Sequence, residues 1–296
     1  MSEFKRNFNE KLIKDLKETQ LFQKLYVDVK NGKVFPSIRN NTINFYYEGC
    51  SLFKYDNKGF STIYKYLINN DKEKDKYIFG DGSSSCKVSS QGFIVDNFVD
   101  GYKSIKQTIR DCYAKPEAVL TTGFYDFSFF KDGDKNDYVL LEIEAAFEKL
   151  TKKESEKRRG TDRIDVVLFN KIKKQIIFCE VKKFNDSRIF SKKGESAEVV
   201  GQLKRYEEQI NQGKDRIIDC YNQAFACYSE LFETPKCTVE SIYPQAVLFV
   251  CGCEPEKYEK IAKKEVDKIA EETGYKTFFS SEVKKGVLID IINSCT

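Results

Sequence analysis

The chain has 296 residues and a formal net charge of +4, from 50 basic and 46 acidic residues. Hydrophobic residues make up 41% of it, which is enough for a sizeable core and excludes disorder over most of its length. The charge is too balanced to indicate nucleic-acid binding through bulk electrostatics. The absence of histidine excludes Ser–His–Asp and Cys–His catalysis, as well as histidine-ligated zinc.

The expected location is the cytoplasm, with no membrane partner. No apolar run approaches the roughly 18 residues that a membrane span needs. The charged, amphipathic start of the chain lacks the apolar core of a signal peptide. Ten scattered cysteines without C-x-x-C spacing fit reduced thiols, and the alternative is a metal-site remnant formed by Cys237, Cys251 and Cys253.

The first half of the chain predicts an α+β region, residues 1–135, of unknown role. The expected elements are a helix over 1–25, strands between 26 and 67 with a hairpin turn at 56–59, a loop over 79–92, a helix over about 94–114 and a strand over 124–130. Turn residues at 131–137 mark the boundary to the second half.

The second half, residues 136–296, predicts a separate α/β domain. The expected elements are a helix over 138–156, a strand over 163–169, a turn over 170–175, a strand over 176–183, helices over 197–212 and 216–232, a strand over 245–252, a helix over 254–274 and a strand over 286–292. Helices interleaved with strands are typical of α/β folds.

The strand over 176–183 ends in a charged pair. Glu180 and Lys182 are two residues apart, so they project from the same face of the strand. Asp165 lies in the preceding, almost wholly apolar strand, and the short turn lets the two strands pair antiparallel. Two carboxylates brought together repel unless a cation lies between them, and Mg²⁺ bound by carboxylates, water and a phosphate would satisfy these charges.

Lys182 then suits a site for phosphodiester hydrolysis. It can orient a metal-bound water or stabilise the negative charge that develops as the water attacks phosphorus, and no histidine is required.

The order of these residues resembles the PD-(D/E)XK nuclease superfamily. The match is Asp165 followed by Glu180-Val181-Lys182, and Gln202 with Tyr206 matches the Q-x-x-x-Y element of the RecB-like branch. The resemblance implies a restriction-endonuclease-like αβββαβ core in the C-terminal half. It also implies a Mg²⁺- or Mn²⁺-dependent deoxyribonuclease, with RNA as a substrate that is not excluded.

The resemblance also implies residue roles. Asp165, Glu180 and the backbone carbonyl of Val181 would bind the metal, and Lys182 would be catalytic. Gln202 and Tyr206, which share one helix face, would orient Lys182 or the substrate backbone.

The first helix of the family contributes a further acidic residue, which is Glu144 or Glu148 here, and the choice between them stays open. RecB-like members often carry a histidine on that helix, which this chain cannot supply. The cysteines do not reproduce the iron–sulfur spacing of Cas4 proteins.

The sequence leaves several alternatives open. Glu3-Phe4-Lys5 and Glu282-Val283-Lys284 have the same E-x-K form. The second triplet follows no apolar strand and has no Asp-bearing hairpin partner, so it is expected to be a solvated turn. Gln202 and Tyr206 on their own would be ordinary helix surface. The alternative function is a nucleic-acid-binding or protein-interaction module that does not cleave.

Residues 1–135 carry no recognisable motif. This region is expected to recognise a target, recruit a regulatory partner, form a homo-oligomeric contact or control the nuclease, in a defence or mobile-element setting by analogy. Its aromatic strands could stack on bases, although aromatic strands more often form core.

Overall fold

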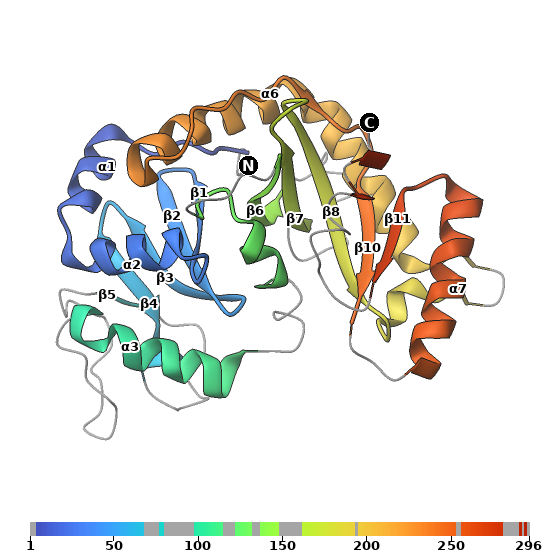
Figure 1. Ribbon diagram of the computed structural model, residues 1–296, viewed down its shortest axis with the longest axis horizontal. Coiled ribbons are helices and arrows are strands. Elements are labelled where there is room, and N and C mark those ends of the chain that lie inside the picture. The colour runs from blue at the N-terminus through green and yellow to red at the C-terminus, as the bar shows by residue number, and fades with distance from the viewer. Residues whose placement is uncertain are drawn as a thin grey trace, which may run out of the picture.

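The computed structural model describes most of the chain in a mixed α/β fold with two sheets (Figure 1). The described residues are 4–67, 77–79, 98–114, 122–131, 137–147, 162–192, 195–252, 256–280, 290–291 and 293–294.

The N-terminal part is built around an antiparallel five-stranded sheet in chain order. Its elements are α1 (Glu10–Lys17), α2 (Gln20–Lys30), β1 (Phe35–Arg39), β2 (Thr42–Tyr47), β3 (Cys50–Asp56), β4 (Gly59–Ile63), β5 (Tyr77–Phe79) and α3 (Phe98–Thr108). The predicted hairpin turn at 56–59 is confirmed: Asp56 pairs with Gly59, which adopts a φ of 89° that favours glycine. The first predicted helix is two helices, separated by the Thr19 cap that accepts from the Phe22 amide.

The two faces of this sheet differ in character. Phe45 and Phe53 are opposite each other on one face, where their rings pack against Phe22 of α2 and Tyr102 of α3. The next pair in register, Asn44 and Lys54, points to the other face. Helices therefore cover one face and leave the other polar.

The C-terminal part is built around a mixed six-stranded sheet. Its main strand order is β11-β10-β8-β7-β6, with the short β9 beside β8. The strands are β6 (Tyr138–Ala146), β7 (Arg163–Asn170), β8 (Gln175–Lys183), β9 (Ser241–Ile242), β10 (Val247–Cys251) and β11 (Thr277–Ser280). Strands β6, β7 and β8 form an antiparallel meander, whereas β10 runs parallel to β8 and β11 runs parallel to β10.

One long helix joins the two halves. Helix α6 (Glu198–Phe232) runs along both sheets, with its C-terminal end beside α1 (Figure 1). Tyr228 of α6 accepts a hydrogen bond from the Ile38 amide of β1 at 3.0 Å. Helix α7 (Glu256–Thr273) lies next to β11 and ends before Gly274, whose φ of 72° confirms the predicted stop.

A buried ion pair also crosses between the halves. Arg6, near the N-terminus, donates to Glu142 of β6 at 2.8 Å, and both side chains are buried. Glu142 also accepts from Tyr221 of α6 at 2.6 Å. Buried hydrophobic residues form one continuous cluster that includes both sheets.

The predicted helix over 138–156 is wrong where the structure describes it. Residues 138–146 form β6, which pairs with β7 along most of its length. The apolar side chains Leu140, Ile143 and Phe147 fit helical spacing, but a bulge between Leu140 and Glu142 and the left-handed φ of 50° at Glu144 break the strand's alternation. A bulged and mostly buried strand thus imitates a helical pattern.

Two other predictions are wrong, and a third lies largely outside the described residues. The strand over 124–130 is a 3₁₀ helix, Gly123–Phe127, whose aromatic side chains fill core without extended backbone. The two helices over 197–232 are one, because Gly213 is tolerated inside a helix that buries Ile210 and Ile217 on the same face. The last predicted strand, 286–292, lies largely outside the described residues, and Asp290 and Ile291 are helical.

Candidate active site

The predicted hairpin over 163–183 is confirmed, and its two strands separate at the charged residues. The pairing of β7 with β8 runs from Asn170–Gln175 to Val166–Cys179. Beyond that point, β7 continues to pair with β6 and β8 with β10. Asp165 and Glu180 are the next residues on the two sides of this fork.

Glu180 and Lys182 point the same way, as their spacing predicts. The Lys182 ammonium donates to Oε1 of Glu180, and both side chains are buried in the sheet. Oε2 of Glu180 is also buried and makes no hydrogen bond within the described part of the chain. An unsatisfied buried carboxylate oxygen is costly, so this atom is suited to receive a further ligand.

Asp165 joins this pair across the fork. Its Oδ2 accepts from the Val181 amide at 2.8 Å and lies 3.9 Å from the Lys182 ammonium. One third of its side chain is exposed, so the site is open to solvent on the Asp165 side. The hairpin therefore brings Asp165, Glu180 and Lys182 together.

Burial and crowding perturb both carboxyl groups. Burial raises the pKa of Glu180 to about 7, and the Asp165 carboxylate adds to this rise while Lys182 opposes it. Burial also raises the pKa of Asp165, against the opposing effects of Lys182 and the Val181 amide. Two carboxylates facing one ammonium leave excess negative charge beside the buried Glu180, which favours a proton or a metal cation.

Helix α6 supplies the two residues of the Q-x-x-x-Y element. Gln202 donates from Nε2 to Oε1 of Glu180 and to the Tyr206 hydroxyl, both at 2.7 Å. The Tyr206 hydroxyl donates to the Arg163 carbonyl at the start of β7. The side chain of Tyr206 is almost fully buried, so the alternative that these two residues are ordinary helix surface is wrong for Tyr206.

Glu144 lies at the edge of this site, on a strand and not on the expected helix. Its side chain is 46% exposed and lies 3.6 Å from the Arg163 guanidinium. Its charge raises the pKa of Asp165, which places it within electrostatic range of that carboxylate. Glu148, the other candidate, lies outside the described residues.

Arg188 is a nearby cation that the sequence did not single out. It follows β8 in a short 3₁₀ helix, Ser187–Ile189, where Asp186 holds its guanidinium through bonds of 2.9 and 2.5 Å. That pairing raises the pKa of Arg188, and the charges of Glu180 and Asp165 add to the rise. Its position directly after the E-x-K strand is the only sequence signal that marks it.

The donor set suits a hard divalent cation. Within the described ranges, no group of three or more acidic, cysteine or histidine side chains is arranged to hold a metal. Asp165 and Glu180 are thus the two carboxylates that could bind a metal ion at this site. Mg²⁺ commonly binds to one or two carboxylates and completes its shell with water and substrate phosphate, so the residues fit such an ion. The Val181 carbonyl as a ligand stays a prediction.

Two further findings bear on the class of protein. None of the helices in the described ranges has the length and apolar character to cross a membrane. No family model matches the chain, and neither the curated proteins nor the solved structures contain a significant match.

Proposed function

We propose that this chain is a metal-dependent nuclease that hydrolyses phosphodiester bonds in DNA. The observation that carries the proposal is the meeting of Asp165, Glu180 and Lys182 at the β7–β8 fork, with one buried oxygen of Glu180 free of hydrogen bonds from the described residues. A purely structural charge cluster would be expected to satisfy all of its buried oxygens.

The order of elements around the site supports a restriction-endonuclease-like core. The meander β6-β7-β8 is followed by α6 and then by β10, which is parallel to β8. Apart from the short β9 between α6 and β10, this order matches the βββαβ part of the expected αβββαβ core. Asp165 lies on its second strand, the E-x-K triplet on its third strand and the Q-x-x-x-Y element on the helix that follows.

Asp165 and Glu180 would hold Mg²⁺ or Mn²⁺, with the Val181 carbonyl as a further ligand. A metal ion at such a site supplies an activated water and neutralises charge on the phosphate. Glu144 is close enough to influence the electrostatics of Asp165, and it is the candidate for the additional acidic residue.

The remaining residues stabilise the transition state or orient the Glu180 carboxylate. Lys182 places a positive charge where negative charge develops on the phosphate oxygens, and a fixed cation in a poorly hydrated site favours the transition state. Gln202 holds Oε1 of Glu180 and so fixes which carboxylate oxygen faces the substrate. Tyr206 anchors Gln202 to the backbone of Arg163 and acts as a positioning residue.

The test is cleavage of DNA and RNA of the same sequence in Mg²⁺ or Mn²⁺, with Asp165→Ala, Glu180→Ala and Lys182→Ala assayed beside the wild type. The proposal predicts metal-dependent cleavage of DNA that each substitution lowers by at least about a hundredfold. Cleavage that survives all three substitutions would contradict it. Metal-dependent stabilisation of the wild type without cleavage of either polymer would favour the non-cleaving binding module.

A further inference from the structure

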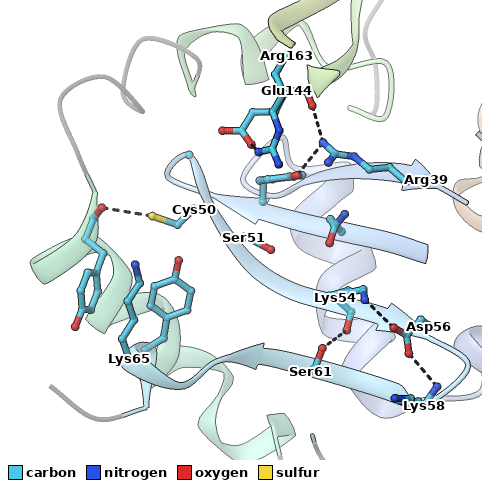
Figure 2. A pocket seen from close by; sticks show the side chains of 15 residues that line it. Arg39, Cys50, Ser51, Lys54, Asp56, Lys58, Ser61, Lys65, Glu144 and Arg163 are labelled. Carbon is cyan, nitrogen blue, oxygen red and sulfur yellow. Dashed lines mark hydrogen bonds and ion pairs between the residues drawn. The ribbon is translucent and has the colours of Figure 1, made fainter. Parts of the chain in front are cut away.

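A groove lies between the polar face of the N-terminal sheet and the ends of β6 and β7 (Figure 2). Its volume is about 640 Å³. Strand β3 forms its floor through Ser51 and Lys54, and Glu144 and Arg163 form the rim on the other side.

The groove is basic, although the chain as a whole is nearly balanced. Two acidic side chains, Asp56 and Glu144, line it. Five basic side chains also line it: Arg39, Lys54, Lys58, Lys65 and Arg163. An excess of cations on one concave face is the electrostatic footprint expected of a surface that binds a polyanion.

The lining follows from the register of the sheet. Asn44, Lys54 and Ser61 are successive partners across β2, β3 and β4, so they form a polar row on the face opposite the aromatic core. Antiparallel sheets commonly leave one face to water, and on its own such a row would be a solvated surface. What distinguishes this row is that Glu144 of β6 and Arg163 of β7 line the same groove.

The rim of the groove belongs to the candidate active site. Arg163 precedes Asp165 by two residues on β7, and its carbonyl accepts the hydrogen bond from Tyr206. Arg163 itself is 56% exposed and lies 3.6 Å from Glu144. Because residues two apart on a strand share a face, Arg163 and Asp165 project from the same side of β7, and a chain bound at Arg163 would lie near Asp165.

Arg39 connects the N-terminal sheet to this rim. It reaches from β1 to the Glu144 carbonyl at 2.8 Å and to the Tyr46 hydroxyl at 3.1 Å. Its Nε is buried and makes no hydrogen bond to any described residue, and the nearest carboxylate oxygen, on Glu142, is 3.9 Å away. This arginine links the two walls. Lys58 and Arg163 are the exposed cations of the groove, whereas Lys54 and Lys65 are half-buried, and Lys54 is paired with Asp56 at 2.8 Å.

We propose that this groove binds the sugar–phosphate backbone of a single nucleic-acid strand and directs it to the Asp165–Glu180–Lys182 site. The inference rests on the proposed nuclease function and gives residues 1–135 a role in holding the substrate. Lysine and arginine contacts to phosphate position a strand without reading its sequence.

The size of the groove favours one strand over a duplex. Its volume is within the range of small-ligand pockets, which matches a few nucleotides of one strand. Single-strand-binding proteins use a comparable basic groove that follows the backbone. The aromatic rings at the end of the groove already form cation–π contacts with a lysine. The Lys65 ammonium lies 4.9 Å from the Tyr113 ring centre and 5.3 Å from the Tyr66 ring centre. The groove therefore recognises charge and not bases.

The test is fluorescence anisotropy with a labelled oligothymidylate in EDTA, so that no metal-dependent cleavage occurs, at several salt concentrations. The variant is Lys54→Gln/Lys65→Gln in the full chain, and the control is Lys264→Gln on the exposed surface of α7, away from the groove. A duplex of the same length is measured alongside. Circular dichroism melting establishes that each variant is folded.

The inference predicts that the double variant binds the single strand roughly tenfold more weakly and that its slope of log K against log salt is about 1.4 smaller, at about 0.7 for each lost contact. The control should match the wild type. An unchanged slope in a folded double variant, or tighter binding of duplex than of single strand, would overturn it.

Cleavage in Mg²⁺ is measured separately, which keeps the two proposals distinguishable. If the groove variant binds and cleaves single strands like the wild type, this inference fails and the nuclease proposal stands. If the groove residues govern binding but the wild type never cleaves, the nuclease proposal fails.

Discussion

Gln202 donates a hydrogen bond to Glu180 at 2.7 Å and so connects the Q-x-x-x-Y element on α6 to the E-x-K triplet on β8. These two motifs are separated by a charged loop in the sequence, and nothing in their spacing requires contact. The same Gln202 nitrogen contacts Tyr206, so the helix holds one oxygen of the carboxylate through a short network. This network holds Oε1 of Glu180 and leaves Oε2 without a hydrogen bond from the described residues.

Metal binding should stabilise the protein through Glu180. An ion that binds only the native site raises the free energy of unfolding by mass action, about 2.7 kcal/mol at a hundredfold excess over its Kd. We expect Mn²⁺ or Mg²⁺ to raise the Tm of the wild type and not that of Glu180→Gln. The exposed Glu240, paired with Lys174 at 2.6 Å, offers Glu240→Gln as a control that should respond like the wild type. Equal shifts in all three proteins would argue against a metal at this site.

Stability should fall as the pH rises through the titration of Glu180. Its pKa is raised from an ordinary value of 4.5 to about 7, so between these values the native state retains a proton that the unfolded chain has lost. The free energy of unfolding therefore decreases with rising pH in this window, by up to about 3 kcal/mol. Urea unfolding at pH 5 and pH 8 should show this decrease in the wild type and a smaller one in Glu180→Gln.

Metal stabilisation should have the opposite pH dependence. The ion requires the ionised carboxylate, so its effect on Tm should grow as the pH rises through about 7. Metal stabilisation that is the same at pH 5.5 and pH 8 would mean that Glu180 is not a ligand.

Lys182→Met should separate catalysis from metal binding. The methionine keeps much of the side-chain volume but removes the ammonium that contacts Glu180 and lies 3.9 Å from Asp165. We expect cleavage to fall by about 10²–10³-fold, as for the loss of a group that stabilises transition-state charge. The metal-dependent Tm shift should persist. Cleavage within a few-fold of the wild type would remove Lys182 from the mechanism.

Tyr206→Phe and Tyr221→Phe form a matched pair on one helix. Each removes one hydroxyl from a buried ring. The Tyr206 hydroxyl donates to the Arg163 carbonyl beside the site. The Tyr221 hydroxyl donates to Glu142, outside the site, through a hydrogen bond of 2.6 Å. Both variants should lose roughly 1–2 kcal/mol of stability. Only Tyr206→Phe should lower kcat, by about tenfold, and the positioning role fails if the two variants have the same kcat.

The Arg6–Glu142 pair should be needed for the two halves to fold together. Arg6→Met leaves the buried Glu142 carboxylate without the guanidinium at 2.8 Å, and breaking a buried ion pair from one side costs about 3–5 kcal/mol. The double variant Arg6→Met/Glu142→Leu should recover part of this loss, since it removes both members of the ion pair. Urea denaturation followed by far-UV circular dichroism provides the measurement. A loss below 1 kcal/mol in Arg6→Met would show that the pair does not join the halves.

The sequence predicts the hairpin better than the strand beside it. The runs ending at Asn170 and Lys183 are short, β-branched and joined by a tight turn, so strand pairing and the meeting of Asp165 with Glu180 follow from local rules. Strand β6 has no such turn, and its bulge near Glu142 hides the alternation. Its strand character depends on pairing with β7, which is a tertiary effect.

The groove and the buried cross-link could not be predicted from the sequence. Lys54 and Arg163 are far apart in the chain, and only the packing of the two sheets brings them to one cavity. Arg6 and Glu142 likewise meet through the fold, and neither lies in a recognisable motif. Long-range pairs of this kind carry no periodic signal, so the role of residues 1–135 has to come from three-dimensional structure.

The most direct test of the central claim is the loss of circular and linear single-stranded DNA in the presence of Mg²⁺, compared with EDTA, with three proteins. These are the wild type, Glu180→Gln and Glu282→Gln, where the last changes the same E-V-K letters elsewhere in the chain. The account predicts metal-dependent cleavage by the wild type and Glu282→Gln and none by Glu180→Gln. Metal-dependent cleavage by Glu180→Gln at the wild-type rate would contradict it.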